Sequence, residues 1–203
     1  MALIDVSVPL RPNMIVWDDA AIRVERTLAI AAGDVCNETE LGLSVHTGTH
    51  VDAPLHFVDG APPIDSLPPE LFVGPAEVVD AQAAERRIDG ALVAELVPQG
   101  TERVLFKTRS ARLWDLAGFS EDYVCLDASG AAVLVERGVR LAGIDYLTIG
   151  DEEAHRVLFR GGIVALEGLD LRAVEPGPFR LVCTPVLIAG ADGAPARALL
   201  EPL

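Results

Sequence analysis

The sequence predicts an α/β fold with a mixed sheet, in a single domain that covers residues 1–203. Short runs of alternating apolar and polar residues in the N-terminal third are typical of strands. The second half instead alternates apolar runs with segments of helical spacing. No linker rich in Gly, Ser or Pro divides the chain, and a domain of this length buries about 70 % of its unfolded surface.

The N-terminal third is expected to form a half-exposed antiparallel sheet. Its strands are predicted over residues 3–10 and 22–30 and over a run that ends at Leu43. The proline-rich stretch over residues 61–75 is predicted to be a loop, because proline cannot donate to a strand ladder.

The second half is predicted to alternate strands and helices. The helices are expected over 128–138, which ends at Gly138, and over 151–162, which has acids in its first turn and glycine at its end. The pattern over 123–145 predicts a βαβ unit with parallel strands and a right-handed crossover. The expected strands are 103–108, 123–127, 139–145 and 162–168.

Composition argues against several classes of partner and location. The formal net charge is −15, with 16 Lys and Arg against 31 Asp and Glu, so neither nucleic acid nor an anionic membrane surface is an expected partner. The N-terminus lacks the basic region of a signal peptide, and no apolar run is long enough for a membrane span. Three scattered cysteines without CxxC spacing predict reduced thiols and a cytoplasmic protein.

Three of the four histidines fall within the segment HTGTHVDAPLH, which begins at residue 46. In an extended chain, alternate side chains share a face, and four polar side chains of this segment would project to one side: His46, His50, Asp52 and His56. Imidazole nitrogens and a carboxylate converging on one point form a ligand set for a divalent ion. Because no thiolate belongs to the set, zinc or manganese is favoured over copper(I) or an iron–sulfur cluster.

This segment resembles the HxGTHxDxPxH signature of the metal-dependent cyclase family, which includes bacterial kynurenine formamidases and isatin hydrolase. Later blocks of the chain also resemble the family: LFKTRSARLW, GVRLAGIDYL, the segment from His155 to Glu167, LEGLDL and GADGAPARALL. The resemblance therefore covers nearly the whole chain. It implies a swivelling β/β/α, cyclase-like fold and a homodimer or higher homo-oligomer.

The resemblance also implies which residues form the site. His46, His50 and Asp52 would bind metal, His155 and Glu167 would complete the centre, and Asp52 would bridge if two ions are bound. The implied cofactor is Zn²⁺, as one or two ions, or Mn²⁺.

Two further roles follow from the same resemblance. His56, the last histidine of the signature, would be the catalytic acid and base, and Trp17 would contact the substrate. Considered as single residues, three of these side chains also suit purely structural roles. Trp17 suits a core position, His155 suits a solvated helix face, and Glu167 in its apolar run could be paired by an arginine instead of a metal.

The implied function is hydrolysis of an amide C–N bond in a small-molecule substrate by metal-activated water, with N-formylkynurenine as the leading candidate. A cyclic amide or lactone is the alternative substrate. From another class, His50, Asp52 and His155 also fit the facial triad of a non-haem Fe(II) oxygenase, which predicts an all-β jelly roll. A non-catalytic metal-binding protein is the remaining alternative.

Overall fold

The computed structural model describes residues 2–17 and 22–203, and its centre is an eight-stranded mixed sheet. The strand order is β1-β12-β11-β5-β7-β9-β10-β4, and a further pairing of β12 with β4 closes all but β1 into a barrel. The pairs β5–β7, β7–β9 and β9–β10 are parallel, and the others are antiparallel. The strands are β1 (Ile4–Asp5), β4 (His50–Asp52), β5 (Val73–Asp80), β7 (Arg103–Lys107), β9 (Leu141–Ile144), β10 (Val164–Glu167), β11 (Gly177–Pro185) and β12 (Gly193–Pro202).

Residues that alternate along the strands separate two hydrophobic cores. On β7, Leu105 packs into one cluster, while its neighbours Val104 and Phe106 pack into the other. The first cluster fills the barrel with side chains such as Leu166 and Leu200. The second lies between the barrel and its helices. Period-two alternation therefore gives each central strand two buried faces.

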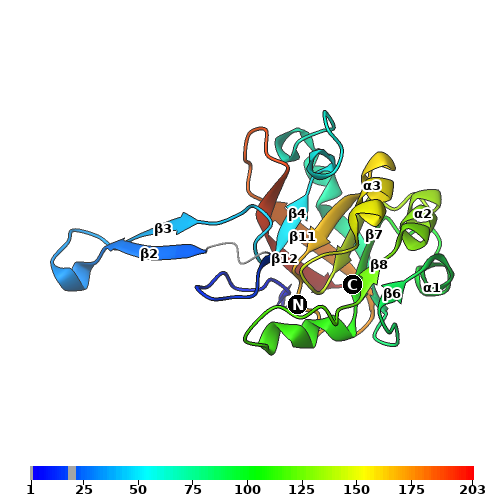
Figure 1. Ribbon diagram of the computed structural model, residues 1–203, viewed down its shortest axis with the longest axis horizontal. Helices are drawn as coiled ribbons and strands as arrows, with labels where there is room; N and C mark the ends of the chain where they lie inside the picture. Colours follow the sequence, from blue (N-terminus) through cyan, green and yellow to red (C-terminus); the bar gives the residue numbers. More distant parts are fainter. Residues whose placement is uncertain (1, 18–21) are drawn as a thin grey trace.

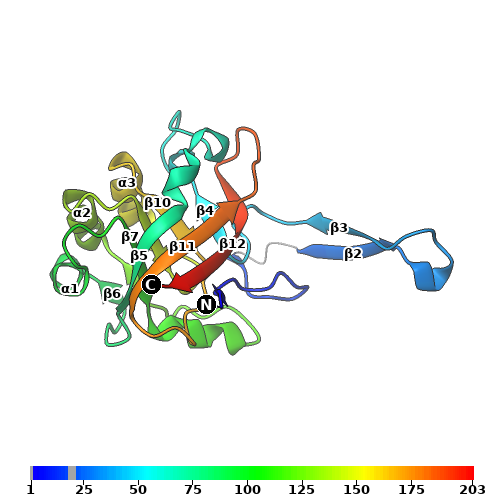
Figure 2. The same ribbon diagram turned by 180° about the vertical axis from the view of Figure 1, so that it is seen from behind.

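Three α-helices cover one side of the barrel, on the right in Figure 1 and on the left in the reversed view of Figure 2. Each begins at an aspartate whose side chain accepts a hydrogen bond from a backbone N–H of the first turn, as N-caps do. They are α1 (Gly90–Leu96), α2 (Ala128–Glu136) and α3 (Glu152–Arg160). Short 3₁₀ helices also occur at Ile30–Ala32, Pro54–His56, Ile64–Ser66, Pro69–Leu71 and Arg109–Asp115.

Two smaller strand pairs lie outside the barrel. β2 (Arg23–Leu28) and β3 (Glu38–Gly42) form an antiparallel ribbon that projects from the body in both views. β6 (Arg87–Ile88) and β8 (Cys125–Leu126) form a short parallel pair.

The predicted α/β class with a mixed sheet is confirmed, as are helices within 128–138 and 151–162. The predicted βαβ unit over 123–145 is wrong, because β8 pairs with β6 and only β9 belongs to the barrel. The predicted N-terminal sheet is instead a projecting ribbon plus β1, which pairs with β12. Three helices packed on a barrel also contradict the all-β jelly roll that the oxygenase alternative requires.

Within the part of the chain that the structure describes, no helix combines the length and apolar character needed to cross a membrane.

Candidate metal centre

The centre begins with the pairing of β4 and β10 at the closure of the barrel. Val51 and Leu166 are opposite each other and point into the barrel core. Alternation therefore turns His50, Asp52 and Glu167 to the other face, toward the helices. In this register Glu167 is opposite His50. Three polar side chains, each 3 % exposed or less, thus share one small region of the outer face.

Helix α3 brings His155 over this face of the sheet. Asp151 is the N-cap of the helix, and its carboxylate accepts a hydrogen bond from the N–H of Ala154 at 3.0 Å. His155 lies in the first turn and is buried, and its Nε2 is 3.0 Å from Oε1 of Glu167 and 3.8 Å from Oδ2 of Asp52. The polar face of α3 therefore supplies the buried His155 ring to the centre, as well as side chains that are exposed to solvent.

The segments before and after β4 supply the other two histidines. His46 precedes the strand, and its Nδ1 lies 2.7 Å from Oδ1 of Asp52. His56 follows in the 3₁₀ turn Pro54–His56, and its ring stacks on that of His46 with centroids 3.9 Å apart. Gly193 of β12 leaves room for the His46 ring, because a Cβ there would lie 2.9 Å from its Cε1.

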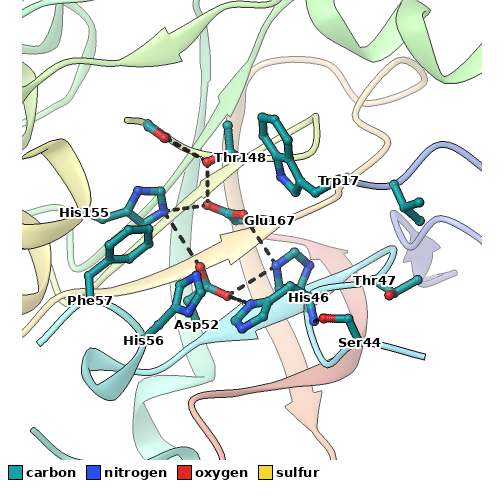
Figure 3. A pocket seen from close by; sticks show the side chains of 13 residues that line it. Trp17, Ser44, His46, Thr47, Asp52, His56, Phe57, Thr148, His155 and Glu167 are labelled. Carbon is teal, nitrogen blue, oxygen red and sulfur yellow. Dashed lines mark hydrogen bonds and ion pairs between the residues drawn. The ribbon is translucent and has the colours of Figure 1, made fainter. Parts of the chain in front are cut away.

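The hydrogen bonds of the buried histidines determine which ring nitrogen carries the proton. Nδ1 of His50 lies 2.9 Å from the carbonyl of Gly48, and Nδ1 of His155 lies 2.9 Å from the carbonyl of Asp151. A carbonyl only accepts, so each Nδ1 donates. In the neutral rings, Nε2 of both histidines therefore presents a lone pair, and each faces buried carboxylate oxygens. Figure 3 shows His155 with its ring directed at Glu167.

This arrangement fits a divalent metal ion. Nε2 of His50 has no hydrogen-bond partner among the described residues, although it lies 3.3 Å from Oδ1 of Asp52 and 3.4 Å from Oε2 of Glu167. A lone pair and two carboxylates buried together repel one another unless a cation lies between them. The oxygen and imidazole donors, with no thiolate, are those that divalent metals accept in proteins.

The same need for positive charge affects protonation. Burial lowers the pKa of His50, but the carboxylates of Asp52 and Glu167 outweigh burial and raise that pKa to about 10. Burial raises the pKa of Asp52, yet the neighbouring His50 and His46 rings more than reverse it and lower the pKa overall. Protons on the histidines thus balance the carboxylates when no metal ion is bound.

A pocket of about 440 Å³ opens over the centre. Its polar lining consists of the histidines and carboxylates together with a few hydroxyl groups, and Val16, Trp17 and Phe57 are apolar lining residues. In Figure 3, Trp17 and Phe57 lie on opposite sides of the charged cluster. The indole of Trp17 donates to the carbonyl of Leu147 at 3.4 Å and packs on Phe119 with centroids 5.1 Å apart. The Phe57 ring stacks on His155 at 4.6 Å. A flat aromatic group therefore has surfaces to stack against beside the charged cluster.

All seven residues named from the sequence line this pocket: Trp17, His46, His50, Asp52, His56, His155 and Glu167. His56 differs from the buried set because its side chain is 28 % exposed. Two ligand-like triads share Asp52, one with His46 and His56 and the other with His50 and Glu167.

Sequence reasoning missed two contributors to this geometry. The carboxylate of Asp192 contacts both His46 and His56, and the backbone N–H of Ile149 donates to Oε1 of Glu167 at 2.7 Å. Asp192 lies in the block GADGAPARALL, whose resemblance to the family was a signal that its side chain has a role. A backbone donor such as Ile149 leaves no signal in residue types.

The fold and this cluster define a barrel protein with a buried histidine–carboxylate centre for a divalent ion. Residues 4–152 match the family model described as putative cyclase. A kynurenine formamidase from Salinibacter ruber is 39 % identical, covering 99 % of this chain and 98 % of the relative. The chain therefore belongs to the cyclase family, as the signature segment predicted.

Solved structures agree with this assignment. A potential metal-dependent hydrolase with cyclase activity superposes with a TM-score of 0.86 at 32 % identity, covering 98 % of this chain and 96 % of that one. Isatin hydrolase A from Ralstonia solanacearum also has a TM-score of 0.86, at 23 % identity and with 98 % and 91 % covered, and this match shows the shared fold.

Proposed function

We propose that the chain is a formamidase-like, metal-dependent hydrolase of amide C–N bonds, with N-formylkynurenine as the leading substrate. The observation that carries the proposal is the convergence of histidine lone pairs and two buried carboxylates beneath an aromatic-walled pocket. Full-length similarity to kynurenine formamidases supports the same reaction class.

His46, His50, Asp52, His155 and Glu167 are proposed to hold the metal. Zn²⁺ or Mn²⁺ suits these donors, and Asp52 belongs to both groups of candidate ligands, so it would be shared if two ions are bound. A divalent ion at such a centre supplies an activated water at neutral pH and polarises the substrate carbonyl.

The chain's own residues would carry the proton and orient the substrate. His56 would take a proton from the attacking water and deliver it to the leaving amine nitrogen, so that water and amide give a carboxylic acid and an amine. Its burial, which dominates over the nearby carboxylates, lowers the pKa of His56, so the neutral ring that accepts a proton is favoured near pH 7. Trp17 and Phe57 would stack on the aryl ring of the substrate.

Metal analysis and a hydrolysis screen test the proposal. Purified protein is expected to hold at least one zinc or manganese ion per chain and to hydrolyse N-formylkynurenine faster than isatin or simple lactones. Faster turnover of isatin or a lactone would replace the substrate and keep the metal centre. Metal-loaded protein that hydrolyses none of them would instead favour a metal-binding protein without catalytic activity.

A His56→Ala variant tests the acid–base role separately. Loss of one positioned proton-transfer group is expected to lower kcat by about 10²–10⁴-fold while metal content stays at the wild-type level. Metal content is measured by plasma emission spectrometry on the sample used for kinetics. Wild-type turnover by this variant would remove His56 from the mechanism.

We further propose one domain over residues 1–203, a homodimer or larger oligomer, and a cytoplasmic location. Pairing of β1 with β12 joins the two ends of the chain, which supports one domain. An isolated two-stranded ribbon is marginally stable, and Leu41 within the β2–β3 ribbon is 57 % exposed. Both points favour a second chain beside the ribbon. Light scattering on purified protein tests the oligomer, and a single-chain mass would contradict it.

Three free cysteines support a location in a reducing compartment such as the cytoplasm.

A further inference from the structure

Asp192 is an acidic residue that contacts two histidines of the site and has no role in the proposed mechanism. It lies in the loop before β12, and its Oδ2 is 2.9 Å from Nε2 of His46 and 3.1 Å from Nδ1 of His56. One carboxylate oxygen therefore contacts a proposed metal ligand and the proposed acid–base residue at the same time.

A carboxylate accepts, so His56 donates from Nδ1 to Asp192 and its lone pair is on Nε2. His46 has a carboxylate at each nitrogen, Asp192 at Nε2 and Asp52 at Nδ1, the latter at 2.7 Å. If a metal ion takes Nδ1 of His46 together with Asp52, the contact with Asp192 keeps the remaining proton of the ring on Nε2. The two buried histidines, His50 and His155, are oriented by backbone carbonyls. Of the three proposed histidine ligands, only His46 depends on a side chain for its orientation.

The backbone around Asp192 is held firmly enough to aim the carboxylate. The carbonyl of Asp192 accepts from the N–H of Ala53 at 2.9 Å, directly after β4. Two residues earlier in the loop, the N–H of Gly190 donates to Oδ1 of Asp65 at 3.0 Å. The stacked rings of His46 and His56, with planes 27° apart, both reach the same carboxylate from one side.

We propose that Asp192 is a positioning residue that sets the tautomers of His46 and His56 together, and so links metal affinity to proton transfer. The inference rests on the proposed function: its metal half rests on the proposed ligand set, and its kinetic half rests on the proposed reaction. It predicts two separable defects when the carboxylate is removed.

Metal affinity tests the His46 contact without any turnover. Zinc is titrated against a chromophoric chelator for wild type, Asp192→Ala, Asp192→Asn and the control Asp65→Asn. Removing an outer partner of a histidine ligand weakens metal binding by about 10–100-fold, and this is expected for Asp192→Ala. Asp192→Asn keeps an acceptor oxygen and should recover part of the loss. The control contacts the same loop but no histidine, so it should stay within about twofold of wild type. Equal affinity of Asp192→Ala and wild type would overturn this half.

A double-mutant cycle at saturating zinc tests the His56 contact. Asp192→Ala should lower kcat by about tenfold or more with little change in KM, and should cause no further loss of kcat in the His56→Ala background. If Asp192→Ala lowers kcat by the same factor with and without His56, the inference that Asp192 acts through His56 is overturned. A merely structural role of Asp192 would lower kcat equally in both backgrounds.

Nitrogen NMR of the His56 ring tests the contact between Asp192 and His56 without any turnover. In zinc-loaded wild type the proton should be on Nδ1, and in Asp192→Ala that preference should be lost. An unchanged ring signal would overturn the inference. Failure of the hydrolysis screen, with the affinity and NMR changes observed, would overturn the proposed reaction and leave the role of Asp192 standing.

Discussion

At the scale of single residues, Asp145 is the buried carboxyl that the proposed metal centre does not use. It follows β9 and is 0 % exposed, and its oxygens accept from the backbone N–H of Thr108 at 2.7 Å and contact the Thr108 hydroxyl at 2.6 Å. Burial raises the pKa of Asp145 to about 7, although the hydrogen bonds from Thr108 act in the opposite direction. At mildly acidic pH, the carboxyl of Asp145 is therefore protonated in the folded state and ionised in the unfolded state.

This difference predicts the sign of a pH effect on stability. Between the unfolded pKa of 3.8 and the folded value of about 7, the folded state binds more protons than the unfolded state. The contribution of Asp145 to the free energy of unfolding is therefore fully present below about pH 4 and is lost as the pH rises through about 7. The slope from one group is at most about 1.4 kcal/mol per pH unit. Asp145→Asn resembles the protonated acid and lacks this slope. Urea unfolding from pH 4.5 to 7.5 should therefore show the variant gaining stability relative to wild type as pH rises. Parallel curves would contradict the raised pKa.

At the scale of elements, the geometry of the centre depends on how closely the segment before β4 approaches the end of β10. Gly168 follows Glu167 with φ +71°, and a Cβ on it would lie 2.0 Å from the carbonyl oxygen of Gly48. The hydroxyl of Thr49 donates to the carbonyl of Gly168 at 2.5 Å, which joins the two segments beside His50. Glycine is required here both for its backbone angle and for the close approach.

Two glycine variants separate these effects. Gly162, in the turn after α3, has φ +78° and nothing within 4 Å of a Cβ, so Gly162→Ala should cost only backbone strain of about 1–2 kcal/mol. Gly168→Ala must also move the Gly48 segment and should cost at least about 3 kcal/mol more, with weaker zinc binding. Unfolding midpoints and zinc titration measure both quantities. Equal losses in the two variants would mean that the close approach is unimportant.

The elements also show where sequence patterns are informative. Helices α2 and α3 are predictable because an aspartate precedes each and a glycine follows each within two residues. Periodicity does not predict strands β5, β11 and β12, because each contains proline, which normally argues against a strand inside a sheet. The pattern around β8 predicts half of a βαβ unit, but only two residues pair, and they pair with β6. Pairing partners depend on tertiary contacts that local periodicity does not encode.

At the scale of the whole molecule, the sequence predicts which residues belong to the candidate site better than it predicts how the fold brings them together. The signature segment identified its histidines by spacing, although the reason was not a single extended strand: β4 spans only His50–Asp52, and the flanking histidines lie in turns. Asp192 is 146 residues from His46 in the chain, and only closure of the barrel by β12 brings the two together. Distant partners of this kind need the fold.

With the proposed ligands, metal binding would be coupled to closure of the barrel. β4 pairs with both β10 and β12, and it carries His50 and Asp52, while β10 carries Glu167. Without a metal ion, burial and the neighbouring carboxylate of Asp52 raise the pKa of Glu167, but the hydrogen bonds with His155 and His50 outweigh them and lower that pKa overall. A metal ion that binds only the closed barrel stabilises it by about 2.7 kcal/mol at a hundredfold excess over Kd.

Removal of the metal is thus expected to lower the melting temperature. A stabilisation of about 2.7 kcal/mol corresponds to roughly 5–10 °C in a chain of this size. Scanning fluorimetry before chelation, after chelation, and after zinc is restored measures the change and its reversal. The His50→Ala variant is the control. Its melting temperature is expected to be lower than that of wild type before chelation and not to change when chelator is added, because the chelator acts by removing the metal from the centre. Hydrogen exchange should locate the loss of protection in β4 and β10, with the helix α1 unchanged, because the ligand-bearing strands are those that close the barrel. A wild-type melting temperature that does not change on chelation would separate barrel stability from this site.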